Sequence, residues 1–146
     1  MNDLLLTALA EIGVREKIGK EDNPRIIEYF NLMKLDGRAL KDETAWCSAF
    51  MNAVCIMANY ERTRRLTARS WLEAGYAPTE GRQRIGDACI LWRESPTSWK
   101  GHVGIYIRED EKYVWLLGGN QRNKVCIMKY RKSRVLGYRR LKRQYI

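Results

Sequence analysis

The sequence predicts an α+β domain in which N-terminal helices pack on a C-terminal antiparallel β-sheet of about five strands. Two observations lead to this fold class. Apolar residues recur at helical spacing up to about residue 75, and short β-branched or aromatic runs replace them after about residue 86. The chain has 146 residues, 45% of them apolar, which is enough for one self-supporting core. We therefore expect residues 1–146 to form a single domain.

Helical periodicity and capping residues place the expected helices. Asn23 followed by Pro24 is typical of a helix N-cap with proline in the first turn. The polar cluster 41–44 precedes a long apolar run, which indicates a buried central helix, and Thr67 can cap a shorter one. The expected helices cover residues 3–12, 24–34, 45–58 and 68–74.

Strands are expected wherever short apolar runs alternate with turn-forming residues. Residues 109–112 are typical of a hairpin turn, and Gly118-Gly119-Asn120 indicates a tight loop. Alternation puts His102 and Tyr106 on one face of their strand and Val103 on the other. The expected strands cover residues 89–92, 103–107, 113–117, 125–130 and 135–141.

The charge is strongly asymmetric. The net charge is +10, yet all 17 acidic residues lie in 1–111, and residues 112–146 hold 11 Lys and Arg. Such a tail could bind nucleic acid, an anionic membrane or a bacterial envelope. The composition is about as consistent with a basic sheet face that only contacts solvent. The apolar run 4–10 is too short for a membrane span and lacks the flanks of a signal peptide, so synthesis in a cytoplasm is expected.

Cys47 is the candidate nucleophile. It lies near the start of the expected central helix, where free backbone N–H groups and the helix dipole favour a thiolate. Taken alone, such a cysteine is more often a buried core thiol. Cys55, Cys89 and Cys126 fall in apolar segments and are expected in the core. With no CxxC pair and one histidine, neither zinc nor any other metal or cofactor is expected.

His102 and Asn120 complete a possible catalytic set. His102 begins a strand between two glycines, which suits a general base that must approach a ligand closely. Asn120, at the end of the next strand, could fix the tautomer of the imidazole. The order helix cysteine, strand histidine and strand-end asparagine is the papain-type order of nucleophile, base and orienting residue.

Short motifs in order along nearly the whole chain resemble the CHAP-type cysteine amidohydrolases and peptidases that cut bacterial peptidoglycan, especially a compact phage endolysin-like subset. The motifs are Ile12-Gly13-Val14 with Glu16 and Gly19, Asn23-Pro24 with Ile27 and Tyr29, Trp46-Cys47-Ser48-Ala49-Phe50 with Asn52, Ala68-Arg69-Ser70-Trp71-Leu72, Gly86-Asp87, Gly101-His102-Val103-Gly104, Gly118-Gly119-Asn120-Gln121 and Gly137-Tyr138-Arg139-Arg140. The resemblance implies a papain-like fold in which Cys47 attacks, His102 is the base and Asn120 is the third member.

The chain also differs from some members of the family that it resembles. Where some carry a glutamate on the strand of the third residue, this chain has Gly118 and Gly119, so Asn120 alone is expected to orient the ring. Other relatives bind calcium through an aspartate-rich loop before the cysteine. Asp36, Asp42 and Glu43 are too sparse for that loop, so no metal is expected.

Substrate contacts are expected near the catalytic set. The N–H of Cys47 is the first oxyanion donor, and Gln121 and Thr44 are candidates for the second, with Gln121 counted as a substrate-binding residue. Trp99, in a polar loop beside His102, is the expected aromatic contact with substrate. Trp46 and Trp71 are expected in the core.

The expected function is hydrolysis of an amide bond of peptidoglycan by a phage lysis enzyme. The bond could be N-acetylmuramoyl-L-alanine or one within the stem peptide or cross-bridge, and the enzyme could be free, virion-attached or a secreted toxin. It would act on the bacterial cell wall after release, as a monomer with no obligate protein partner and no separate wall-binding domain. Its basic tail would dock on the anionic envelope.

Other functions compete with this interpretation. The tail with Tyr130, Tyr138 and Tyr145 could belong to a nucleic-acid-binding protein, although no helix-turn-helix, zinc-finger or RNP-like pattern is present. A glycosidase could use Glu11 and Glu16, but then the cysteine, histidine and asparagine would have no role. A catalytically inactive wall-binding module is the third alternative.

Overall fold

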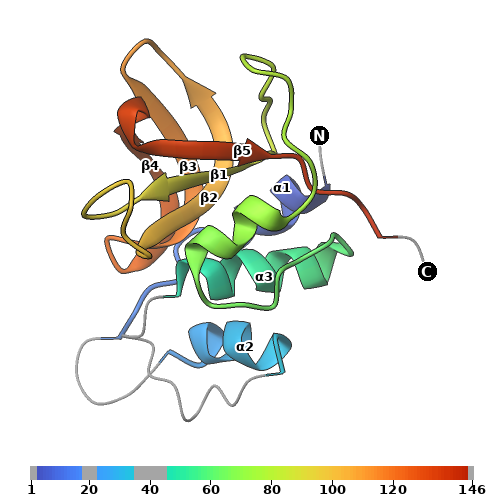
Figure 1. Ribbon diagram of the computed structural model, residues 1–146. Helices are drawn as coiled ribbons and strands as arrows, with labels where there is room; N and C mark the ends of the chain where they lie inside the picture. The colour runs from blue at the N-terminus through green and yellow to red at the C-terminus, as the bar shows by residue number, and fades with distance from the viewer. Residues whose placement is uncertain (1–2, 18–22, 35–45, 145–146) are drawn as a thin grey trace.

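The computed structural model describes residues 3–17, 23–34 and 46–144 and confirms the α+β class. Its five strands form one antiparallel sheet in the order β4-β3-β2-β1-β5. Helices lie against one face of this sheet (Figure 1). The strands are β1 Ala88–Trp92, β2 Gly101–Glu109, β3 Tyr113–Gln121, β4 Lys124–Arg131 and β5 Val135–Arg139.

The helix α3 is the centre of the helical layer. It lies between the sheet and α2 and contacts β2, β3 and α1 (Figure 1). Almost every residue of α3 is buried, as its continuous apolar sequence predicts. The helices are α1 Asp3–Leu9, α2 Pro24–Leu32, α3 Cys47–Ala58 and the short 3₁₀ helices η1 Ala68–Glu73 and η2 Lys132–Arg134.

Capping residues explain where two helices begin and end. The Asn23 side chain accepts a hydrogen bond of 2.8 Å from the backbone N–H of Arg25, which confirms the predicted N-cap of α2. At the C-terminal end of α3, the capping residue Asn59 adopts the left-handed conformation with φ of 60°. Thr67 makes no side-chain capping bond, and the segment after it is a 3₁₀ helix instead of an α-helix. The cluster 41–44 lies outside the described residues.

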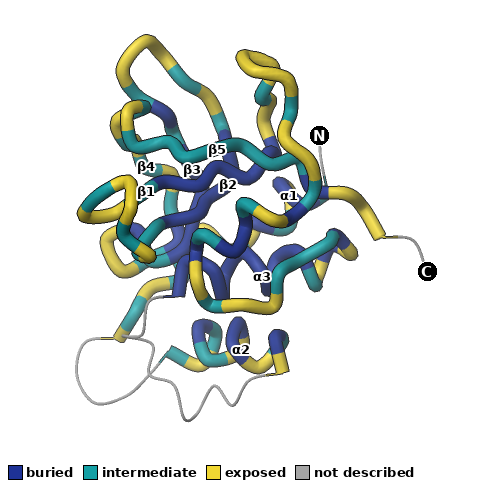
Figure 2. The backbone as a smooth tube through the Cα atoms, viewed as in Figure 1, coloured by how far each residue is buried: buried dark blue, intermediate teal, exposed yellow. Residues whose placement is uncertain are grey.

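The sheet separates two apolar clusters. Val103 and Ile105 point to the helices and join the main core, whereas Tyr106 belongs to a smaller cluster on the opposite face with Cys89 and Leu116. This arrangement confirms the alternation predicted for β2. In Figure 2 the central strands β1 and β2 are mostly dark blue, whereas β5 at the edge of the sheet is teal. Among the described helices, none combines the length and apolar character required to cross a bilayer.

Gly118 and Gly119 lie inside β3 and not in the tight loop that the sequence predicted. A Cβ at Gly119 would be 2.6 Å from the Cβ of Phe50 and 2.8 Å from the Trp46 ring. These glycines therefore serve close packing of β3 on the start of α3. The turn comes later, at Arg122 and Asn123, which both have positive φ.

A short segment after α1 pairs with the start of β4. Gly13 N–H donates to Val125 O (3.0 Å), Val125 N–H donates to Val14 O (2.7 Å), and Glu16 N–H donates to Asn123 O (2.8 Å). The sequence predicted only a polar loop here, because four residues are too few to show a strand pattern. The pairing places Glu16 beside the first residues of α3.

Candidate active site

A cavity of about 460 Å³ lies where α3 begins, β2 begins and β3 ends. Its lining includes Cys47, His102, Asn120 and Gln121. Residues that are far apart in the sequence therefore meet in one place, as the predicted papain-type order requires.

Cys47 is the first residue of α3, so its backbone N–H has no partner within the helix. Its side chain is only 5% exposed. Burial raises the pKa of the thiol, and the N–H groups of Val103, Ser48 and Cys47 itself and the charge of Arg93 oppose that rise only in part. The sequence predicted a lowered pKa at this helix start, but removal from water is the larger effect. The resting side chain is a neutral thiol.

His102 is also neutral at rest. Burial lowers the pKa of its imidazole to about 4, and the charges of Arg93 and Arg134 act in the same direction. The hydrogen bond with Gln121 opposes this shift. Cys47 and His102 line the same cavity, and a neutral imidazole has a free lone pair and is therefore able to accept a proton.

Gln121 determines which nitrogen of His102 carries that lone pair. The Gln121 Nε2 donates to the carbonyl oxygens of Cys126 (2.6 Å) and Leu116 (3.2 Å), so its Oε1 must face the histidine. This Oε1 is 2.9 Å from His102 Nε2. Because an amide oxygen only accepts, Nε2 carries the hydrogen and Nδ1 is the basic nitrogen.

Tyr130 supports the same ring from β4. Its hydroxyl oxygen is 3.2 Å from His102 Nε2, and the two ring centres are 5.2 Å apart. The imidazole is thus held by an amide and an aromatic ring. No hydrogen bond to another described residue engages its Nδ1.

Asn120 lines the cavity but does not take the position expected for it. Among the described residues, the side-chain hydrogen-bond partners of His102 are Gln121 and Tyr130, and not Asn120. Asn120 adopts φ of 57° beside a register shift in β3. Gln121 in turn is not placed as a substrate contact, because it is 1% exposed and its amide is fully engaged. Neighbouring residues of a strand point to opposite faces, so the residue that contacts the imidazole is one position later than expected.

The tryptophans follow the expectation for the core more closely than that for substrate. Trp46 and Trp71 are fully buried, and their Nε1 atoms donate to Glu16 (2.7 Å) and Ser48 (2.9 Å). Trp99 is 71% exposed in the loop before β2, and it is not among the residues lining the cavity. Thr44, Asp36, Asp42 and Glu43 lie outside the described residues.

The other cysteines differ from Cys47 in their surroundings. Cys55 and Cys89 are buried, and burial raises the pKa of each thiol. Cys126 is partly buried, and its Sγ lies 3.5 Å from the carbonyl oxygen of Gln121. None of these three lines the cavity. Within residues 3–17, 23–34 and 46–144, no group of three or more His, Cys, Asp or Glu side chains is placed to hold a metal ion.

The two carboxylates considered for a glycosidase are separated. Glu11 accepts hydrogen bonds from Arg25 (2.6 Å) and Tyr29 (2.9 Å) between α1 and α2, so its role is structural. Glu16 lines the cavity and accepts from Trp46. No second described carboxylate shares that cavity with Glu16, so this arrangement lacks the pair of acids that a glycosidase uses.

The cavity wall carries three arginines that sequence reasoning did not single out for it. Arg93, Arg122 and Arg134 line it together with Glu16. Arg134 is held by a hydrogen bond from its Nε to Trp92 O (3.1 Å). The sequence grouped Arg134 with the basic tail, because only the tertiary fold turns the short η2 segment toward His102.

Four other cations of the tail are engaged within the fold. Lys132 pairs with Glu109, Arg140 pairs with Asp87, and Arg143 pairs with Asp3. Arg139 donates to the carbonyl oxygens of Ala74 and Gly75. The tail is thus an ordered part of the sheet and its surroundings.

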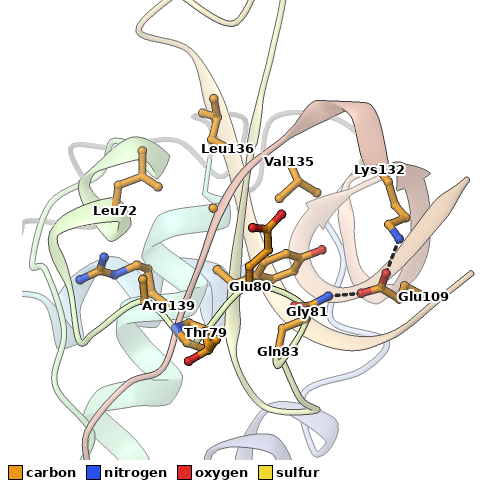
Figure 3. Close-up of a pocket in the computed structure, with 14 residues that line it drawn as sticks. Leu72, Thr79, Glu80, Gly81, Gln83, Glu109, Lys132, Val135, Leu136 and Arg139 are labelled. Atoms are coloured by element: carbon orange, nitrogen blue, oxygen red, sulfur yellow. Dashed lines mark hydrogen bonds and ion pairs between the residues drawn. The ribbon is translucent and has the colours of Figure 1, made fainter. Parts of the chain in front are cut away.

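A second cavity of about 540 Å³ lies beside β5 and is lined by residues such as Leu72, Glu80 and Tyr138. On its wall Glu109 accepts hydrogen bonds from Lys132 and Gln83, as Figure 3 shows. No cysteine or histidine lines it. Of the two cavities, only the one at Cys47 brings together a thiol and an imidazole.

No family model and no curated protein matches the chain.

Proposed function

We propose that this protein hydrolyses an amide bond of bacterial peptidoglycan through Cys47, in a papain-like site completed by His102 and Gln121. The observation that carries the proposal is the buried hydrogen bond between Gln121 and His102, which leaves Nδ1 basic in the cavity that contains Cys47. The choice of peptidoglycan rests on the CHAP-type motifs.

The reaction begins from the neutral pair. His102 Nδ1 accepts the proton of the Cys47 thiol as Sγ attacks the amide carbonyl carbon, which gives a tetrahedral oxyanion and an imidazolium. The Cys47 N–H stabilises the oxyanion. Gln121 Oε1 stabilises the imidazolium, because it already accepts the Nε2 hydrogen.

The second half of the reaction regenerates the enzyme. The imidazolium returns its proton to the leaving amine as the C–N bond breaks, which leaves a thioester on Cys47. His102 then takes a proton from a water molecule that attacks the thioester carbon. The carboxylic acid product leaves, and the proton returns to the sulfur.

The polymer is held, in this proposal, by a basic aromatic face formed by Arg108, Tyr113, Trp115, Lys129 and Arg131. Cross-strand pairing puts Trp115 opposite Lys129 and Tyr113 opposite Arg131. The Arg108 guanidinium is 3.6 Å and the Lys129 ammonium 4.5 Å from the centres of the Trp115 and Tyr113 rings. Rings beside cations suit a polymer that carries both sugars and carboxylates.

Digestion of purified peptidoglycan tests the proposal. We expect the wild-type protein to release soluble fragments with a new amine and a new carboxylic acid, and mass spectrometry of the fragments identifies which amide is cut. Iodoacetamide should abolish release. New reducing sugar ends that persist after iodoacetamide treatment would instead indicate a glycosidase, and tight, salt-dependent binding of single-stranded DNA with intact peptidoglycan would indicate a nucleic-acid-binding protein.

A further inference from the structure

We infer that Arg93 and Arg134 form a carboxylate subsite in the catalytic cavity, so the substrate carries a free carboxylate close to the amide that is cut. The inference rests on the proposed function in one respect, because it takes Cys47 as the attacking residue. It adds the chemical character of the substrate next to the scissile bond.

The position of the two arginines is the first argument. Both line the cavity with Cys47 and His102. The positive charge of each acts on His102, and that of Arg93 also acts on Cys47. A ligand group that reaches these guanidinium groups is therefore within the same cavity as the reacting atoms.

The second argument is the lack of counter-charge. Among the described residues, neither Arg93 nor Arg134 forms an ion pair. Glu16 is the single carboxylate of the described residues that lines the cavity, and its Oε1 already accepts the Trp46 hydrogen. Two cations beside a base that must become positive oppose the reaction unless an anion joins them. A substrate carboxylate supplies that anion.

The third argument is that Arg134 is fixed before any ligand arrives. Its Nε donates to Trp92 O, and its guanidinium lies 5.9 Å from the Trp92 ring centre and 5.5 Å from that of Tyr130. These contacts leave its two terminal nitrogens without a hydrogen-bond partner among the described residues. Arginine presents such nitrogens as a planar fork, which matches the two oxygens of a carboxylate.

Two soluble stem peptides that differ in one group test this inference. One carries a free carboxylate on the residue next to the scissile amide, and the other carries the carboxamide. We expect wild-type kcat/KM to be at least about tenfold higher for the carboxylate, because charge-assisted hydrogen bonds are the stronger class. Arg93→Gln and Arg134→Gln should reduce this preference mainly by raising KM for the carboxylate peptide. Arg82→Gln, an exposed arginine outside the cavity, should keep it.

A binding measurement covers the case in which a variant fails to fold. His102 is the only histidine, so its NMR titration is unambiguous. In Cys47→Ala, we expect the carboxylate peptide to raise the pKa of His102 and the carboxamide to leave it nearly unchanged. Equal hydrolysis of both peptides, or equal pKa changes, would overturn the subsite while leaving the proposed function intact. Hydrolysis of neither peptide, with His102 still responding to the carboxylate, would support the subsite and count against the proposed function.

Discussion

Gln121 binds the Nε2 hydrogen of His102 at 2.9 Å, and the carbonyl groups of Leu116 and Cys126 hold the Gln121 amide in that orientation. The protonation of the base thus follows from two backbone oxygens of the sheet. Leu116 lies on β3 and Cys126 on β4, so the pairing of these two strands fixes the amide that contacts the imidazole.

Cys47→Ala should abolish hydrolysis of peptidoglycan, with a loss of at least about a thousandfold in rate, because no other described residue in the cavity replaces the sulfur. Release of soluble fragments from purified peptidoglycan measures the rate. Cys55→Ala is the matched control, since Cys55 is buried in the same helix but outside the cavity. Full activity of Cys47→Ala with a native circular dichroism spectrum would disprove the mechanism.

Gln121→Ala should reduce kcat by about 10²- to 10⁴-fold, because the imidazole loses the acceptor that fixes its tautomer. Asn120→Ala should lose less, since Asn120 makes no hydrogen bond to the ring. Steady-state kinetics on a soluble peptide compares the two variants. The reverse order of effects would return the orienting role to Asn120.

Gln121→Glu should move the acid limb of the kcat/KM profile to higher pH. A carboxylate next to Nε2 favours the imidazolium and so raises the pKa of His102 from about 4. The same substitution replaces the amide donor to two carbonyl groups, so thermal unfolding is measured in parallel. An acid limb that stays in place in a folded variant would show that another group controls it.

Stability should fall as the pH drops from about 6.5 to about 4 because of His102. Its pKa is lowered in the folded state, so the unfolded chain binds the proton more readily across this range. The stabilisation is therefore complete above about pH 6.5 and is lost toward pH 4, by up to about 3 kcal/mol. Urea unfolding of wild type and His102→Gln at several pH values isolates this contribution. Parallel curves for the two proteins would exclude it.

Lysis of whole walls should decline steeply with salt, while hydrolysis of a soluble peptide changes little. The Debye length falls from about 10 Å at 0.1 M to about 3 Å at 1 M, which screens contacts between exposed charges. The triple variant Arg108→Gln, Lys129→Gln and Arg131→Gln should show the high-salt behaviour at low salt. Equal salt sensitivity toward the soluble peptide would refute electrostatic docking.

The ion-paired cations of the basic tail should behave differently from Lys129 and Arg131, the tail cations that belong to the basic aromatic face. Arg140 forms an ion pair with Asp87 (2.8 Å). Replacing Arg140 with a neutral residue should therefore lower the melting temperature more than it lowers wall binding. The sequence showed the excess of charge but not its partners, because Glu109, Asp87 and Asp3 are distant in the chain. Charge counts alone therefore could not separate structural cations from exposed ones.

Local patterns predicted the parts of the fold that local energetics determines. The cap at Asn23, the buried helix after residue 46 and the alternation along β2 all follow from spacing and residue type. The meeting of Cys47 with His102 also followed, from the order of the elements. The hydrogen bond of His102 with Gln121 instead of Asn120 did not follow, because it depends on a register shift between Gly118 and Gln121 that no periodicity reveals.

The positions of Arg93 and Gly119 in the fold also could not be predicted from the sequence, for two different reasons. A lone arginine after a strand has no sequence signal, because its role depends on which groups the fold brings within reach of its charge. A pair of glycines is compatible both with a turn and with close packing of two backbones, and the space left by Phe50 decides between them.

Because there is no room for a side chain at Gly119, we expect this position to accept only glycine when the protein is evolved or engineered. Even one added methyl group would meet Phe50 and Trp46 at less than 3 Å and push β3, which carries Gln121, away from the helix that begins at Cys47. Overpacking of this kind costs about 1–3 kcal/mol. A library selected for faster turnover and one selected only for heat resistance should therefore both retain glycine here, although nothing at this position touches the reacting atoms.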